Sequence, residues 1–313
     1  MATTTITQLP SSGALTGAEV VPIVQGLDTV QTTTQDIADL GGGGGIIAVD
    51  SGASSTVRID NNNCASGQYS TVSGGTYNTA SGACSTVGGG YCNTASGGYS
   101  TVGGGGGNTA SCTCSTVGGG SGNTASEYFT TVGGGRSNLA FDTGSTVGGG
   151  IENTASYRGT TVGGGYSNTA YGYVSTIGGG KCNTAYCCSS FVGGGYSNTA
   201  RGYASTVGGG KCNTSYGCSS FIGGGFCNTA SGYCSTVSGG GNNTASSLYS
   251  SILGGACNNT STFDKAMIVG SNITADRACA TFVNNLSIKS IPTSAAGLPS
   301  GAVWNNGGVL NIV

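Results

Sequence analysis

Two short segments of alternating small apolar and polar residues return every fifteen residues along most of this chain. From residue 61 to residue 255 the period holds without an insertion, which gives thirteen copies such as YSNTARGYASTVGGG at residues 196–210. The third position of a copy is always Asn, from Asn63 to Asn243, and the fifth is Ala except at Ser215. The twelfth position is always Val or Ile. Such a regular period indicates a repeat architecture.

One copy predicts one coil of a parallel β-solenoid, because helical-hairpin repeats need about 33 to 47 residues. The Gly-rich end of each copy also disfavours helix, by about 1 kcal/mol per Gly. We expect one strand over Asn-Thr-Ala-Ser, a second over Ser-Thr-Val-Gly, and tight turns at the glycines. Alternation along a strand then places Asn and Ala on one face, and likewise Ser and Val, while both Thr positions point outward. Thirteen coils stacked at about 4.8 Å would make a rod of about 62 Å.

Degenerate copies extend the repeat at both ends. Residues 46–60 keep Ser55, Thr56 and Val57 in register, and residues 271–285 keep Thr274-Ala275 and Thr281-Phe282. The predicted fold class is therefore all-β, a parallel β-solenoid (β-roll) of about 13–15 coils with fifteen residues per coil. Its predicted parts are an N-terminal cap (1–40), a Gly-rich junction and entry coil (41–60), the solenoid (61–285) and a C-terminal hairpin (286–313).

The N-terminal cap differs from the repeat in charge and pattern. It contains no Lys or Arg but four carboxylates, Glu19, Asp28, Asp36 and Asp39. Residues 20–24 predict a strand at a sheet edge, since Pro22 is tolerated only there. Residues 34–38 predict the start of a short helix with Thr34 as its cap. The glycine run at 41–45 predicts a linker or tight junction.

The C-terminal segment predicts a β-hairpin. Apolar residues at 302–304 and 309–313 flank Asn305-Asn306-Gly307-Gly308, a strong turn sequence. We expect Trp304, the only tryptophan, to anchor this hairpin in an apolar contact at the end of the solenoid. An ordinary hydrophobic plug and a receptor-binding residue are both compatible with its sequence context.

Composition excludes several classes of protein. The 64 glycines rarely fall at every third residue, which excludes collagen, and a net charge of −2 gives no argument for disorder. The nine Lys and Arg residues are scattered, so no nucleic-acid partner is expected. No run of eighteen apolar residues predicts a membrane span. The start MATTTITQLP lacks the features of a secretory signal, so we expect release by lysis or by a dedicated machine.

The fourteen cysteines fall at unrelated positions of the repeat. A disulfide framework or a zinc site would keep a fixed spacing, so we interpret most of them as small, reduced, space-filling residues. Cys212 and Cys227 are the exception, because both occupy the second position in adjacent copies. Stacked coils would place them about 4.8 Å apart, within the Cα range of a disulfide. A disulfide between these two cysteines is therefore our hypothesis.

The chain lacks the residues that most catalytic sites require. It has no His, and the only carboxylates of the thirteen copies are Glu127, Asp142 and Glu152. Asp142 and Glu152 lie ten residues apart, on different edges of successive coils, which does not suit a glycosidase pair. Calcium-binding β-rolls need a regular Asp, and the Gly triplets lack the Lys of a phosphate-binding loop. We predict no catalytic, cofactor-binding or metal-binding residues, no cofactor, and no enzyme activity.

The outward positions suggest two further readings. The eleventh position is Thr in ten of thirteen copies, and flat Thr arrays on solenoids can bind ice, but Phe191 and Phe221 interrupt this row.

One Val and one Ala per coil bury little apolar surface, so we expect extra burial by self-association, as a homotrimer or in a filament. The outward Thr and the ninth-position aromatics are candidates for that contact: Tyr69, Tyr99, Phe129 and Tyr249.

The consensus YSTVGGGYSNTASG resembles the heads of trimeric autotransporter adhesins of the YadA type, whose left-handed parallel β-rolls have coils of similar length. It also resembles phage and other virion fibre proteins. ITQLP, LTGAEVVPIVQ and QTTTQDIA resemble the N-terminal segment of phage tail and fibre proteins, and IPTSAAGLPSGAVWNNGGVLNIV resembles their closing segment. The resemblance implies that residues 1–40 dock onto a baseplate or capsid protein. The membrane-barrel anchor of an autotransporter is not recognisable, which favours the virion interpretation.

The sequence thus predicts a non-catalytic virion fibre (a tail or capsid fibre) that acts as a spacer rod and attaches to a host surface through an unidentified receptor. Its location would be the virion, assembled in the host cytoplasm and extracellular once released. The alternative is a self-assembling extracellular filament or a bacterial surface adhesin, because open solenoid ends can stack head to tail. An ice-binding solenoid is a minor alternative.

Overall fold

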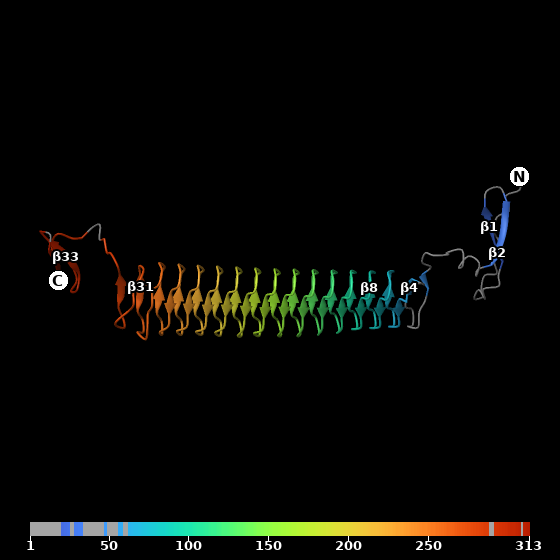
Figure 1. Cartoon of the computed structure of the whole chain (residues 1–313), viewed down its shortest axis with the longest axis horizontal. Helices are drawn as coiled ribbons and strands as arrows, with labels where there is room; N and C mark the ends of the chain where they lie inside the picture. Colours follow the sequence, from blue (N-terminus) through green and yellow to red (C-terminus); the bar gives the residue numbers. More distant parts are fainter. Residues whose placement is uncertain are drawn as a thin grey trace. The chain divides into compact units, whose positions relative to one another are not determined.

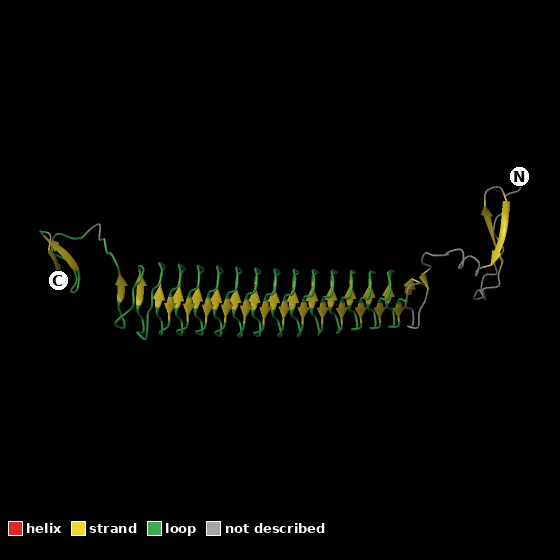
Figure 2. Ribbon diagram, viewed as in Figure 1, coloured by secondary structure: helices red, strands yellow, loops and turns green. Residues whose placement is uncertain are grey.

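The computed structural model describes residues 20–25, 28–33, 47–48, 56–58, 62–287, 291–307 and 309–313. These residues form strands, turns and loops, and no helix occurs among them (Figure 2). The chain divides into two compact units, which are described one at a time. Unit 1 is Met1–Gly159 with Gly163–Gly165, and unit 2 is Thr160–Val162 with Tyr166–Val313.

A two-stranded antiparallel hairpin begins unit 1. Strand β1 (Val20–Gln25) pairs with β2 (Asp28–Thr33), and Gln25 and Asp28 form the pair that closes the turn. The strand expected over residues 20–24 is confirmed, and Pro22 lies in a sheet that has only edge strands. The sequence did not predict β2. The helix expected at 34–38 and the linker at 41–45 lie outside the described residues.

The coils of unit 1 build two parallel ladders of short strands (Figure 1). The eleventh and twelfth positions form β4 (Thr56–Arg58), β6 (Thr71–Val72), β8 (Thr86–Val87), β10 (Thr101–Val102), β12 (Thr116–Val117), β14 (Thr131–Val132) and β16 (Thr146–Val147). The fourth and fifth positions form β5 (Cys64–Ala65), β7 (Thr79–Ala80), β9 (Thr94–Ala95), β11 (Thr109–Ala110), β13 (Thr124–Ala125), β15 (Leu139–Ala140) and β17 (Thr154–Ala155). Strand β3 (Ile47–Ala48) lies antiparallel on β4 at the start of the stack.

Unit 2 contains the same two kinds of ladder. The eleventh and twelfth positions form β18 (Thr161–Val162), β20 (Thr176–Ile177), β22 (Phe191–Val192), β24 (Thr206–Val207), β26 (Phe221–Ile222), β28 (Thr236–Val237) and β30 (Ser251–Ile252), followed by β31 (Met267–Val269) and β32 (Thr281–Val283). The fourth and fifth positions form β19 (Thr169–Ala170), β21 (Thr184–Ala185), β23 (Thr199–Ala200), β25 (Thr214–Ser215), β27 (Thr229–Ala230) and β29 (Thr244–Ala245). The predicted parallel β-solenoid with a fifteen-residue repeat is confirmed.

The register within each ladder is one repeat. Thr101 pairs with Thr116 and Val102 with Val117, so each residue stacks on its equivalent in the next coil. The first positions add a third ladder of single parallel bridges, such as Thr76 with Tyr91. We expected two strands per coil. The third contact arises because the chain, after leaving the glycine turn, runs parallel to the equivalent segment of the next coil for one residue.

The register changes near the end of the solenoid. Ile252 pairs with Ile268, sixteen residues later, and Ile268 pairs with Phe282, fourteen residues later. The opposite ladder keeps the fifteen-residue offset, since Asn259 bridges both Thr244 and Thr274. One extra residue is therefore accommodated after Thr260, and one is lost before β32, so the expected strand at Thr281-Phe282 forms with a shifted spacing.

The inside of the coils is made of four small residue types. Position three (Asn), position five (Ala), position ten (Ser or Thr) and position twelve (Val or Ile) are buried, whereas the Thr beside each inner Ala or Val is half-buried. This is the alternation expected from the sequence. No large side chain enters the coil, so coils of fifteen residues can close around a thin core.

Buried Asn side chains connect successive coils. The Nδ2 of Asn123 donates to the carbonyl of Gly119 at 2.8 Å and to that of Gly135 at 2.8 Å. Its Oδ1 accepts from the backbone N–H of Asn138 at 2.9 Å. In unit 2 Asn198 makes the same three contacts, with Gly194, Gly210 and Asn213. One amide per coil thus bonds to three backbone groups, of which the carbonyl of Gly135 also accepts a hydrogen bond from the backbone N–H of Ser121.

The turns need left-handed backbone at three positions of each coil. The fifteenth position is always Gly, and at Gly135, with φ of 90°, an added Cβ would lie 2.0 Å from the carbonyl oxygen of Gly150. The second and ninth positions also have φ near +55°, yet they carry ordinary residues such as Tyr69, Cys212 and the β-branched Val174. An added Cβ would also meet backbone atoms at Gly82 and Gly88, but only the fifteenth position combines such a clash with left-handed backbone and is Gly in every copy.

The expected C-terminal hairpin is confirmed. Strand β33 (Val303–Asn306) pairs antiparallel with β34 (Val309–Ile312), and Trp304 stands opposite Asn311. The strands reach closer to the turn than expected, since Asn306 pairs with Val309. Trp304 is half-buried, and the backbone N–H of Asn305 donates to the carbonyl of Pro292 at 2.8 Å. The anchoring contact proposed for Trp304 stays a prediction.

Candidate functional site

The interior of the coils offers no chemistry beyond hydrogen bonding. The tenth-position hydroxyls point into the core, and eight of them have no hydrogen-bond partner: Ser70, Ser85, Ser100, Ser145, Ser175, Ser190, Ser205 and Ser235. Elsewhere the same hydroxyl donates to the carbonyl three residues earlier, as Ser115 does to Cys112 at 2.6 Å. Side chains able to meet another molecule therefore lie on the outer surface.

The carboxylates of unit 1 serve local contacts. Glu127 and Asp142 share the seventh position in adjacent coils, a relation that the sequence analysis missed. A carboxylate oxygen of Glu127 accepts a hydrogen bond from the Cys112 thiol at 3.8 Å. Asp142 accepts one from the backbone N–H of Thr143 at 2.6 Å. Glu152 is exposed at the second position. The three residues do not converge on a shared cavity in the part of the chain that is described.

The Thr rows give one outward hydroxyl in most of the two-residue strands from β5 to β30, but not in β5, β15, β22 and β26. In such strands the Thr is half-buried outward while the Val or Ala points inward. Phe191 and Phe221 interrupt the eleventh-position row in unit 2 and are exposed. An ice-binding face normally presents two Thr in register on one strand, so this surface does not favour ice binding.

Cys212 and Cys227 lie beside one another in unit 2. Their thiols are free and half-buried, and the backbone N–H of Cys227 donates to the carbonyl of Lys211 at 2.9 Å. Partial burial, and then the charge and the hydrogen bond of the Cys212 thiol, raise the pKa of the Cys227 thiol above its ordinary value. The proximity fits the expected bridge, which stays a prediction.

A column of alternating rings and ammonium groups runs along the first positions of unit 2. We call it the first-position column; its members, each bridged to the next in parallel register, are Tyr166, Lys181, Tyr196, Lys211 and Phe226. The Nζ of Lys181 lies 5.2 Å from the ring centre of Tyr166 and 5.9 Å from that of Tyr196. The Nζ of Lys211 lies 5.9 Å from Tyr196 and 5.6 Å from Phe226. All five side chains are exposed.

A second column of the same kind follows the sixth positions. This sixth-position column consists of Tyr171, Tyr186, Arg201 and Tyr216. The Cζ of Arg201 lies 5.1 Å from the ring centre of Tyr186 and 5.9 Å from that of Tyr216. The rings of Tyr171 and Tyr186 are 5.7 Å apart. Cation–π contacts of this kind hold the rings and cations in an ordered row even though they face water.

Both columns lie in a stretch of sequence without acidic residues. From residue 153 to residue 263 the chain has no Asp or Glu, whereas Lys181, Arg201 and Lys211 fall within it. The sequence analysis read the basic residues as scattered and missed the columns. Aligning the copies by repeat position would have revealed them, because aromatic and basic residues alternate at a single position.

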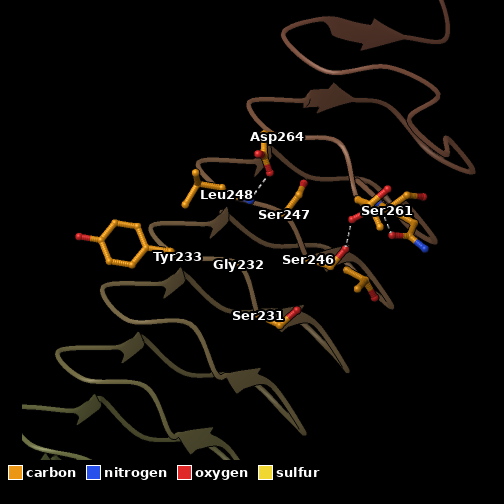
Figure 3. A pocket seen from close by; sticks show the side chains of 11 residues that line it. Ser231, Gly232, Tyr233, Ser246, Ser247, Leu248, Ser261 and Asp264 are labelled. Atoms are coloured by element: carbon orange, nitrogen blue, oxygen red, sulfur yellow. Dashed lines mark hydrogen bonds between the residues drawn. The ribbon is translucent and has the colours of Figure 1, made fainter.

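A shallow, open hollow marks the shifted register at the end of unit 2 (Figure 3). Two of its polar side chains hold the local backbone: Asp264 accepts a hydrogen bond from the backbone N–H of Leu248 at 3.0 Å, and the Ser246 hydroxyl donates to the carbonyl of Ser261. The hollow is therefore explained by the extra residue that widens this coil.

Compared with known proteins, the sequence matches no family and no curated protein. In the described part of the chain, no three His, Cys, Asp or Glu side chains gather closely enough to share a metal ion. The same residues include no helix of the length and apolarity needed to cross a bilayer. The two columns are thus the most ordered candidate for binding that the described surface offers.

Proposed function

We propose that this β-solenoid repeat protein is the structural and adhesive subunit of a virion fibre, without catalytic activity. The observation that carries the proposal is the fifteen-residue period that holds from residue 61 to residue 255. Twelve of thirteen fifth positions are Ala and all third positions are Asn, whereas the outer first, sixth and eighth positions vary freely. A constant scaffold that displays variable side chains at regular intervals is the arrangement expected of a spacer whose outer side chains contact other molecules.

The proposed assembly is a homotrimer. Each coil buries only small side chains, and several large apolar ones face outward in unit 1, among them Tyr99 at 65% and Phe129 at 63% exposure. Burying such rings between copies would add about 1.5–3 kcal/mol per side chain. Residues 1–40 would attach the fibre to a baseplate or capsid protein, and many weak contacts along the units would together hold a host surface.

One feature of unit 1 favours discrete fibres over the alternative of head-to-tail filaments. Strand β3 lies antiparallel on β4, at the edge where a parallel coil of another copy would have to add. Covered edges of this kind prevent strand-to-strand growth. A filament would have to displace β3 first.

Immunogold labelling tests the virion proposal. Antibodies against the purified chain should label fibres on virus particles from the source culture, and sedimentation of the chain should give the mass of three copies. Absence of the protein from purified particles would contradict the virion role. Long filaments of the chain alone in negative stain would favour the filament alternative instead.

A further inference from the structure

We propose that the first-position column of unit 2 binds an acidic polysaccharide, with the sugar chain lying along the column and its carboxylate or sulfate groups at Lys181 and Lys211. The inference rests on the adhesive function proposed above and names the chemical class of its partner. The inference is drawn from the alternation of aromatic rings and cations along the column. Neither folding nor self-association requires this alternation.

The register fixes the spacing of the column. Tyr166, Lys181, Tyr196, Lys211 and Phe226 are joined by consecutive parallel bridges, so neighbouring members lie about 4.8 Å apart at the backbone. Each ammonium group is held between two rings at 5.2 to 5.9 Å from their centres. The row is therefore preorganised, which lowers the entropic cost of binding a long ligand.

The charge of the column selects an anion of modest charge density. Lys181 and Lys211 are two coils, or about 9.6 Å, apart, and no Asp or Glu occurs between residues 153 and 263. A nucleic-acid strand carries a phosphate about every 3.4 Å, much more densely than these cations. A polysaccharide with an acidic group on every second sugar matches the alternation, since two sugar rings span about this distance.

The rings complete the match. Aromatic rings offer apolar surface against which the C–H bonds of a sugar can pack. The two ammonium groups lie over the ring of Tyr196, so the uncharged sugar of each pair would pack against the outward edge of this ring. The sixth-position column repeats this arrangement, with Arg201 between Tyr186 and Tyr216. Two such rows on one unit would strengthen binding by multivalency.

Unit 1 provides an internal contrast. Its first positions hold Tyr91, Gly106, Ser121, Arg136 and Ile151, in which no cation is flanked by rings. Its coils also carry Glu127, Asp142 and Glu152, which would repel an acidic chain. The proposed site is therefore confined to unit 2, and Arg136 serves as a matched control, a cation at the same repeat position without neighbouring rings.

The test is binding of the full chain to hyaluronan, which has one carboxylate on every second sugar, measured by affinity electrophoresis and titration calorimetry. Neutral dextran, oligothymidylate and poly-glutamate are the comparison probes. We expect binding to hyaluronan that weakens with added salt, and none to dextran. The double variant K181Q/K211Q and the variant Y196A should each bind about tenfold more weakly or worse. Arg136→Gln and Tyr203→Ala, which change an exposed cation and an exposed ring outside the columns, should bind like the parent chain.

The outcomes separate this inference from the proposed function. All substituted side chains are exposed, so an unchanged far-ultraviolet circular dichroism spectrum is expected and shows that a binding loss is not unfolding. Equal binding by the parent chain and K181Q/K211Q, absence of hyaluronan binding, or tighter binding of oligothymidylate or poly-glutamate would each overturn the polysaccharide site. If virus particles are labelled but the chain does not bind hyaluronan, the virion-fibre proposal stands and only the polysaccharide site is refuted. If the chain binds hyaluronan specifically but no virus particles are labelled, the virion role is refuted and the polysaccharide site stands.

Discussion

The side-chain oxygen of Asn78 accepts a hydrogen bond from the backbone N–H of Asn93, fifteen residues later, at 3.0 Å. The same contact recurs from coil to coil within each unit. It gives the backbone N–H of each Asn an acceptor in the side chain of the preceding Asn. The buried amide thus adds a side-chain link to the backbone hydrogen bonds that join the coils.

Replacing Asn123 by Ala should destabilise unit 1 by about 3 kcal/mol, because it removes two hydrogen bonds to glycine carbonyls and leaves the buried N–H of Asn138 without its acceptor. Denaturant unfolding measures the loss, and hydrogen exchange at Asn138 should become faster. The exposed Ser121→Ala is the control and should change stability by less than about 0.5 kcal/mol. An unchanged unfolding midpoint for Asn123→Ala would show that the amide ladder is dispensable.

Substitution by alanine should destabilise the protein to different extents at two neighbouring glycines. At Gly135, with φ of 90°, the new Cβ would lie 2.0 Å from the Gly150 carbonyl oxygen, whereas at Gly134 the nearest atom is 4.0 Å away. Gly135→Ala should therefore cost more than about 3 kcal/mol, and Gly134→Ala less than about 1 kcal/mol. Thermal unfolding followed by circular dichroism compares them. Equal melting temperatures would contradict the packing described for the fifteenth position.

Val174 offers a stabilising substitution. It has φ of 55° at the ninth position and is 47% exposed, and a β-branched side chain is strained in left-handed backbone. Val174→Asn should stabilise unit 2 by about 1 kcal/mol, since Asn tolerates this conformation. Thr176→Asn, at an ordinary strand position, is the control and should not stabilise. A lower unfolding midpoint for Val174→Asn would refute the strain.

The thiol of Cys227 should react slowly with iodoacetamide near neutral pH. Its pKa is raised, so at a given pH less of it is thiolate, and the alkylation rate should increase only at more alkaline pH. Cys212→Ser removes a cause of the shift, so the rate profile of Cys227 should move to lower pH. Mass spectrometry of peptides measures both rates. An unchanged profile in the Cys212→Ser chain would contradict the coupling of the two thiols.

Mass spectrometry without reduction tests the bridge itself. After mild oxidation a Cys212–Cys227 disulfide should form in preference to pairs that involve Cys257, because the first two thiols occupy adjacent coils. Cys257 lies two coils after Cys227 and is exposed. Random pairing would argue against preorganisation.

The periodic residues predicted most of the fold. Asn, Ala, Ser and Val occupy the inner positions that alternation assigns to them. In a two-residue strand one side chain must point inward and the other outward, so the small apolar residue takes the inner place. The left-handed backbone at Val174 and Cys212 was not predictable, since closure of the coil imposes it on positions whose residue types vary. The shifted pairing of Ile252 with Ile268 was also missed, because one extra residue inside a loop leaves the flanking pattern intact.

The two columns of rings and cations were hidden in the sequence for a different reason. Lys181 and Lys211 are thirty residues apart in the sequence and look isolated there. Only the stacking of equivalent positions brings each between two aromatic rings. Composition and local motifs report on neighbours along the chain, whereas a solenoid makes neighbours of residues one period apart.

The amide ladder has a consequence for how such a gene can change. Each coil carries its own Asn, which donates to glycine carbonyls on either side and accepts from the next Asn. A duplication or deletion of one whole repeat by recombination therefore restores every one of these contacts at the new junction. The protein can lengthen or shorten over generations in steps of one coil, while a change by any other number of residues must be absorbed in a loop, as after Thr260.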